Sequence, residues 1–167
     1  GAADPAASST LRPTRTTPRE KKTIDFHNKV YIAPLTTVGN LPFRRIMKDF
    51  GADITCGEMA LAFHLLQGNS SDWSLVRRHP CEDVFGIQVA GAFSDQMAQV
   101  AEVVERELDV DFVDINMGCP AKKVTQGYSG SALMRDPDHA LTLIEAVVRA
   151  GSIRRAAEES NLTASAL

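Results

Sequence analysis

Four short apolar segments, each followed by a segment of helical periodicity, set the strongest constraint on the fold of this chain. The apolar segments span residues 29–35, 53–56, 84–89 and 112–115. They are too short for helices and are bounded by glycines and prolines, which is typical of buried strands. Strands that alternate with helices are parallel and are joined by right-handed crossovers. The sequence therefore predicts an α/β fold.

The helices between these strands have predicted caps and predicted buried faces. The caps are Asn40, Ser94 and Asp136. Apolar residues at steps of three or four are expected to face the core: Phe43, Ile46, Met47 and Phe50 in the first helix, Met97, Val100, Ala101, Val104 and Leu108 in the third, and Leu141, Ile144, Val147 and Val148 in the fourth.

Polar side chains gather where the predicted strands end. In chain order they are Thr36, which follows Pro34 and Leu35, then Glu58, Gln88, Asn116 and Cys119. Ligands of parallel α/β proteins lie at the carboxyl ends of the strands, so these residues mark the predicted site. Neither G-x-G-x-x-G nor a P-loop follows any strand, which disfavours dinucleotide-binding sheets and NTPases. We therefore predict the first half of a TIM (β/α)₈ barrel, with four parallel strands and no closure.

A basic arm precedes the predicted barrel. Residues 1–22 carry five basic and two acidic side chains, although the net charge of the chain is −3. The arm lacks apolar periodicity, so we predict that it is disordered and either contacts a polyanion or is simply solvated. Three cysteines without C-x-x-C spacing predict no disulfide framework and no metal site. No segment has the length of a membrane span, and we expect a cytoplasmic protein, with the nucleus as the alternative.

The fourth strand leads into the segment with the most reactive side chains. Asn116 offers an amide that donates and accepts hydrogen bonds, and Cys119 offers a thiol that takes or delivers a proton. A turn asparagine and an ordinary buried cysteine are the alternative. Residues 121–134 form a long polar and basic loop, and such loops carry function more often than packing. The loop therefore favours a functional Cys119.

The segments Asn-Met-Gly-Cys-Pro-Ala-Lys-Lys-Val at residues 116–124 and Gly-Ser-Ala-Leu-Met at residues 130–134 resemble the signature of the tRNA-dihydrouridine synthases. These flavoenzymes reduce a uridine base in tRNA. The resemblance runs from about residue 11 to about residue 150. It is to eukaryotic members of the variable-loop type over residues 20–118 and to bacterial members over residues 117–149. It implies a TIM barrel, FMN as cofactor, NADPH as reductant and tRNA as partner.

The resemblance also implies roles for the residues at the strand ends. FMN would be bound by Pro34, Leu35, Thr36 and Gln88, with Asn116 near both flavin and base and Cys119 as the proton donor. Uracil would receive hydride at C6 and a proton at C5, and a thiol that stays protonated can supply that proton. Glu58 would bind the flipped uracil or merely cap a helix. Gln88 has an alternative as a strand-end amide bonded to backbone, and Lys122 and Lys123 would contact phosphates or be solvated.

The resemblance ends near residue 150. The fifth strand of the family, with its lysine, does not follow, and residues 151–167 weakly resemble the start of a LysR-type helix-turn-helix. The alternative for this segment is a separate amphipathic helix capped by Ser152. We therefore expect three parts, namely an arm over residues 1–22, a partial FMN-binding barrel over residues 23–150 and a helical segment over residues 151–167.

Four strands without closure leave two sheet edges open, which favours self-association. The predicted function is that of a flavin-dependent tRNA-dihydrouridine synthase, in a truncated or composite chain with impaired activity. The alternative is a catalytically silent half-barrel that acts as an interaction module. DNA binding through residues 151–167 ranks last, and the segment from Asn116 to Ala121 argues against a dihydroorotate dehydrogenase.

Overall fold

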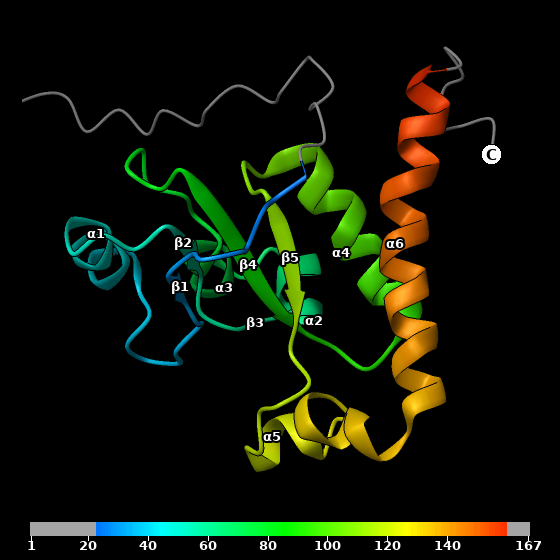
Figure 1. Cartoon of the computed structure of the whole chain (residues 1–167). Helices are drawn as coiled ribbons and strands as arrows, with labels where there is room; N and C mark the ends of the chain where they lie inside the picture. The colour runs from blue at the N-terminus through cyan, green and yellow to red at the C-terminus, as the bar shows by residue number, and fades with distance from the viewer. Residues whose placement is uncertain (1–22, 160–167) are drawn as a thin grey trace, which may run out of the picture.

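A computed structural model of the chain describes residues 23–159, and its centre is a parallel sheet (Figure 1). The strands are β1 (Tyr31–Ile32), β2 (Ile54–Cys56), β3 (Ala60–Leu61), β4 (Val84–Ala90) and β5 (Phe112–Ile115). Both β2 and β3 pair with the same side of β4, because β5 occupies the other side from Gly86 to Val89, where Cys56 lies opposite Gly86 and Ala60 opposite Val89. β1 pairs with β2, and β5 pairs with the other side of β4. The basic arm of residues 1–22 lies outside the described residues.

The helices are α1 (Leu41–Asp49), α2 (Ala62–Leu66), α3 (Ser70–Leu75), α4 (Ser94–Glu107), α5 (Lys122–Thr125) and α6 (Pro137–Glu159), with a 3₁₀ helix, η1 (Gly130–Arg135). Each new strand is added on the same side of the sheet, and right-handed crossovers then place the helices on one face. A doubly wound sheet would reverse its strand order. The α/β prediction is confirmed, and the strand order is that of the first half of a barrel.

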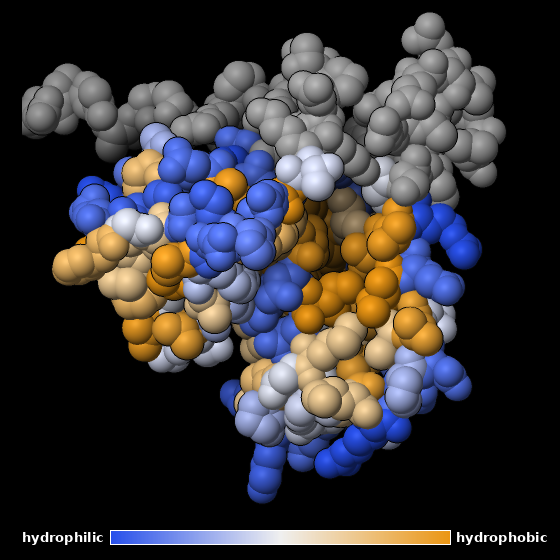
Figure 2. Space-filling model, viewed as in Figure 1, coloured by the Kyte–Doolittle hydropathy of each residue, from blue (hydrophilic) through white to orange (hydrophobic). Residues whose placement is uncertain are grey.

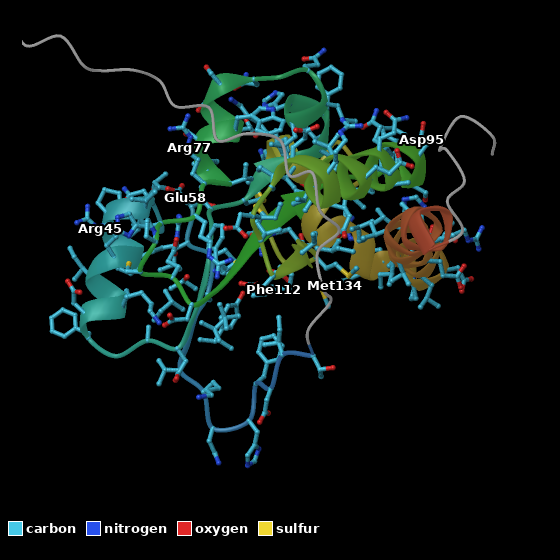
Figure 3. All side chains as sticks on the ribbon, turned by 90° about the horizontal axis from the view of Figure 1, so that it is seen from above. Arg45, Glu58, Arg77, Asp95, Phe112 and Met134 are labelled. Carbon is cyan, nitrogen blue, oxygen red and sulfur yellow. The ribbon has the colours of Figure 1, made fainter. Side chains whose placement is uncertain are left out.

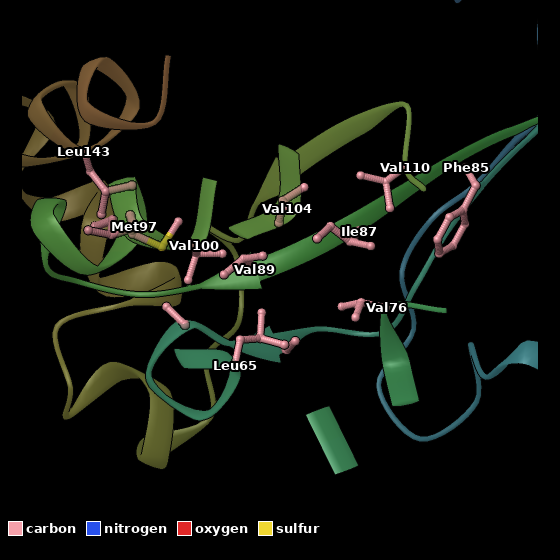
Figure 4. Packing of buried hydrophobic residues seen from close by; sticks show 13 residues of the cluster. Leu65, Val76, Phe85, Ile87, Val89, Met97, Val100, Val104, Val110 and Leu143 are labelled. Carbon is pink, nitrogen blue, oxygen red and sulfur yellow. The ribbon is translucent and has the colours of Figure 1, made fainter. Parts of the chain in front are cut away.

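The core lies between β4 and the helices. Phe85, Ile87 and Val89 alternate along β4 and are all fully buried. They pack with α4 and α6 in one cluster, shown in Figure 4, to which Leu65, Val76, Met97, Val100, Val104, Val110 and Leu143 also belong. The buried face predicted for α4 is therefore confirmed at Met97, Val100, Ala101 and Val104.

The other face of β4 looks toward the interior of the half-barrel. Gly86 lies directly under the ring of Phe112, and a Cβ at residue 86 would overlap that ring. Phe26 and Tyr31 meet Phe112 edge-on, with ring centroids 5.9 and 6.2 Å away. Aromatic rings thus fill the amino-terminal end of this inner face, and they leave its carboxyl end to polar side chains.

A buried ion pair replaces the apolar contact that was predicted for α1. Ile46 and Phe50 are 50% and 82% exposed, whereas Arg44 is only 1% exposed. Arg44 Nε donates to Glu82 Oε1 at 2.8 Å, and Arg44 Nη2 donates to the carbonyl of Arg77 at 2.7 Å. The predicted face of α1 is therefore wrong at Ile46 and Phe50, whereas Phe43 and Met47 are half-buried, and the carboxylate of Glu82 pairs with the buried Arg44.

The predicted caps have mixed outcomes. Asn40 caps α1 by accepting from the Phe43 N–H, and Asp136 caps α6 by accepting from the His139 N–H, so both are confirmed. Ser94 is wrong as a cap, because it is the first residue of α4 and no side chain caps that helix.

The carboxyl-terminal helix also differs from its prediction. α6 turns Leu143 into the core, and of the predicted face only Val147 packs there, since Leu141 and Val148 are 56% and 62% exposed. α6 continues through Ser152 to Glu159, so Ser152 caps no separate helix. The segment compared with a helix-turn-helix is helical as far as Glu159, and residues 160–167 lie outside the described part. No helix within residues 23–159 combines the length and apolar character that crossing a membrane requires.

Removal of one partner from the buried ion pair is expected to destabilise the fold strongly. Thr55 Oγ1 also donates to Glu82 Oε1, and the His79 N–H donates to Glu82 Oε2, both at 2.7 Å. Glu82→Ala leaves a buried guanidinium uncompensated, which typically costs about 3–5 kcal/mol of unfolding free energy. Asp83→Ala is the matched control, since its exposed pair with Lys48 contributes less than about 1 kcal/mol. Equal urea midpoints for the two variants would contradict the assignment.

Alkaline pH is also expected to destabilise the fold. Burial raises the pKa of Cys56 to about 12, despite its hydrogen bond with Tyr31, and burial raises the pKa of Tyr31 as well. The folded state thus binds these protons more tightly than the unfolded state does. The stability that they contribute is therefore full below the usual thiol pKa of 9.0, and it is lost as the pH rises from there toward the pKa of Cys56 in the folded state.

The measurement is the urea unfolding midpoint at a series of pH values from neutral upward. The midpoint should begin to fall near the usual thiol pKa, and the double variant Cys56→Ala/Tyr31→Phe should flatten the fall. A midpoint of the unaltered chain that stays constant through this range would contradict the prediction.

Candidate active site

Two amides meet on the inner face where β4 and β5 end. Gln88 lies directly opposite Asp114 in the sheet, and Gln88 Nε2 donates to Asp114 Oδ2 at 2.7 Å. Asn116, the residue after β5, donates from Nδ2 to Gln88 Oε1 at 2.9 Å. Residues 112, 114 and 116 alternate along the strand and so point to the same face. Figure 3 views the molecule from above and shows Phe112 on the opposite side from Arg77 and Asp95.

Cys119 is tied to the same group of side chains. The Cys119 N–H donates to Asn116 Oδ1 at 3.0 Å. On the other side, the Cys119 carbonyl accepts from the Ser131 N–H at 3.0 Å. Gly130 adopts a positive φ of 61°, and a Cβ there would lie 2.6 Å from the Cys119 oxygen. The loop is thus held on both sides, and its free thiol remains half-buried at the carboxyl edge.

Glu58 contacts the loop that follows β1. Its Oε2 accepts from the Thr37 N–H at 2.7 Å, and the carboxylate is largely buried. Thr37 has a φ of 70°, an unusual value for a β-branched residue, and this hydrogen bond stabilises it. The alternative of a helix cap is wrong, because α2 begins at Ala62 with no side-chain cap.

Pro34, Leu35 and Thr36 form the first part of that loop. The Leu35 carbonyl accepts from the Gly39 N–H at 2.7 Å, which closes a tight turn, and Thr36 is exposed. Within residues 23–159, no hydrogen bond connects these three residues to Gln88 or Asn116. The structure therefore joins the predicted site residues in two groups. Gln88, Asn116 and Cys119 form one group, and the loop after β1 with Glu58 forms the other.

The predicted basic loop contains regular structure. Lys122 and Lys123 lie in α5 and are exposed, and η1 follows. Ser129 Oγ donates to the Val124 carbonyl at 2.9 Å, which folds the segment back on itself. Figure 1 shows α5 and η1 just beyond the carboxyl end of β5. The segment thus lies beside Cys119 and is ordered.

Asp114 is the residue at this site that the sequence analysis did not assign. It lies within β5 and accepts a hydrogen bond from Gln88. A carboxylate is unexpected there, because the other residues of the strand are apolar. The available signal was positional, since Asp114 has the same parity as Asn116 along a predicted strand. Parity alone places both side chains on one face.

Comparison with known proteins agrees with this geometry. Residues 31–157 match the family described as dihydrouridine synthase (Dus). The chain is 60% identical over 120 residues to the "tRNA-dihydrouridine(47) synthase [NAD(P)(+)]-like" protein of Rattus norvegicus, which covers 72% of this chain and 19% of the relative. It is 51% identical over 155 residues to the protein of that name from Oryza sativa subsp. japonica, covering 86% and 23%. The chain thus spans about a fifth of the length of these relatives. Because this family matches most of the chain, the chain belongs to the dihydrouridine synthase family.

Proposed function

We propose that this chain supplies the flavin-facing half-site of a tRNA-dihydrouridine synthase. The observation that carries the proposal is the hydrogen-bonded series Gln88, Asn116 and Cys119 at the carboxyl edge of a parallel sheet. This edge is where barrel enzymes bind their ligands. The family supports the reaction class, and the names of the relatives support uridine 47 of tRNA as the substrate.

FMN fits the polar groups at this edge. Each amide NH₂ has two hydrogens, and the hydrogen bonds described use one from Gln88 and one from Asn116, which leaves one N–H on each. Such donors suit the carbonyl and ring-nitrogen edge of a flavin. Pro34, Leu35 and Thr36 would line the ring from the loop after β1. When bound, FMN supplies hydride to the uracil ring, and NADPH is the proposed source of that hydride.

Cys119 is the proposed proton donor. Its backbone is anchored on both sides, so the thiol is held at a fixed position while its loop remains open to a base. The thiol gives its proton to C5 of uracil as C6 is reduced, and solvent then restores the thiol.

The substrate contacts follow from neighbouring residues. Glu58 Oε2 is engaged with Thr37, which leaves Oε1 to accept from the uracil N–H. Asn116 would contact both the flavin and the base. Lys122 and Lys123 lie exposed in α5 beside the thiol and would contact tRNA phosphates. The cytoplasm or the nucleus is the proposed location.

The central test replaces the thiol. Cys119→Ala should lower dihydrouridine formation on unmodified tRNA by about 10²–10⁴-fold, because a positioned proton donor contributes that much to the rate. The affinity for FMN, measured by fluorescence quenching, should stay within about twofold, because the thiol makes no contact with the amide donors. The assay contains the chain, FMN, NADPH and tRNA.

Cys81→Ala is the matched control for that experiment. Cys81 lies before β4, at the opposite end of the sheet, where its Sγ is 3.0 Å from His79 Nδ1. Its loss should leave the rate unchanged. A Cys119→Ala variant as active as the Cys81→Ala variant would overturn the role of Cys119.

A second candidate function is that of a half-barrel that acts through self-association. Within the described residues, β1 and β5 each pair on one side only. Figure 2 shows apolar side chains gathered between the sheet and α6. The exposed apolar residues of η1 and α6 include Met134, Leu141, Ile144 and Val148. A chain that binds no FMN and forms no dihydrouridine, yet sediments as a dimer that Cys119→Ala does not alter, would favour this candidate.

A further inference from the structure

The hydrogen bonds among Asp114, Gln88, Asn116 and Cys119 all run in one direction. Each amide donates from its nitrogen toward Asp114 and accepts on its oxygen from the Cys119 side, at distances of 2.7, 2.9 and 3.0 Å. An amide group has nearly the same shape when its oxygen and nitrogen are exchanged. Shape alone therefore does not select this direction.

The two ends of the series do select it. The carboxylate of Asp114 only accepts hydrogen bonds, so Gln88 must turn its nitrogen toward it. A backbone N–H only donates, so Asn116 must turn its oxygen toward Cys119. With both ends fixed, the Gln88 oxygen and the Asn116 nitrogen are left facing each other as acceptor and donor.

We propose that Asp114 is a positioning residue that sets the direction of this hydrogen-bond series and thereby holds the Cys119 loop in place. The proposal deepens the function proposed above, on which it rests only for the identity of the ligand. With Asp114 in place, Gln88 and Asn116 each keep a free N–H to offer, so the site selects a ligand edge that accepts hydrogen bonds. In the reversed direction the oxygen and the nitrogen of each amide exchange places, so a ligand would meet an acceptor where it now meets a donor.

The sheet gives Asp114 the rigidity that this role requires. Backbone hydrogen bonds fix the β4–β5 register at both ends, from the Asp111 N–H to the Phe85 carbonyl at 2.7 Å and from the Asn116 N–H to the Val89 carbonyl at 2.9 Å. Gln88 and Asp114 are therefore held opposite each other by the backbone.

An asparagine at residue 114 removes the constraint at this end of the series without changing the shape of the side chain, so the reversed direction becomes accessible. This asparagine can accept from Gln88, as Asp114 does, or donate to it, and in the second case Gln88 turns its nitrogen toward Asn116. The Asn116 nitrogen would in turn face the Cys119 N–H, and two donors cannot pair. The Cys119 N–H thus loses its acceptor in every molecule that adopts the reversed direction.

The test measures hydrogen exchange at the Cys119 backbone amide by NMR. Loss of one hydrogen bond corresponds to a roughly three- to tenfold change, so Asp114→Asn should speed exchange at Cys119 by at least about threefold. Exchange at Ile87, in the centre of β4, should not change. Alkylation of Cys119 by iodoacetamide should be faster in the same variant, because the loop is less restrained.

Two further variants separate positioning from general destabilisation. Asp111→Asn removes a carboxylate that lies just before β5, at the end of the strand far from Cys119. There Asp111 Oδ2 accepts from the Phe85 N–H. This variant should leave the exchange rate at Cys119 unchanged relative to that at Ile87. Gln88→Leu breaks the series while Asp114 stays, so it should speed Cys119 exchange as Asp114→Asn does. The double variant Asp114→Asn/Gln88→Leu should then show no additional change. If one variant fails to fold, the other still tests the coupling.

The outcomes distinguish this proposal from the proposed function. Faster exchange at Cys119 in Asp114→Asn, with no FMN binding by any form of the chain, supports the positioning role and removes the flavin assignment. Unchanged exchange at Cys119 in both Asp114→Asn and Gln88→Leu overturns the positioning role, whatever the affinity for FMN. Equal acceleration at Cys119 and Ile87 also overturns it, because that result indicates global loosening.

Discussion

The arrangement of this molecule depends on β4, a strand covered by helices on one face and turned toward the interior of the half-barrel on the other. Phe85, Ile87 and Val89 anchor it in the core, and the intervening positions belong to the inner face. Because β2, β3 and β5 all pair with β4 in parallel, their ends gather at one edge of the sheet. The chemistry at that edge is thus held by the same packing that stabilises the fold.

Much of the fold follows from periodicity in the sequence. The run from Phe112 to Ile115 is too short for a helix, and the spacing of Met97, Val100 and Val104 identifies one buried helix face. Periodicity gave only part of the buried face at α1 and α6, where Arg44 and Leu143 are buried although the apolar pattern does not include them. A buried arginine requires a carboxylate from another element, in this case Glu82, and such a pairing is tertiary information.

The candidate site was predictable as a location, and less so as a set of interactions. Parallel strands imply that Gln88, Asn116 and Cys119 lie at one edge, and they do lie together. The contact of Glu58 with Thr37 was not predictable, because it depends on a loop with positive φ. Asp114 was not predicted as a site residue for a related reason. The role of a carboxylate within a strand depends on its neighbour in the adjacent strand, and the sequence does not show which residue that is.

The ring of Phe112 lies over Gly86 and closes the inner face at its amino-terminal end. A planar ligand that entered from the carboxyl edge would lie along this face and could go no deeper than the ring. The ring can lie flat because Gly86 has no side chain. A methyl group there would push the ring away from β4 and reduce the space above it. Gly86 would therefore influence how deep such a ligand lies and which of its atoms reach the amides of Gln88 and Asn116.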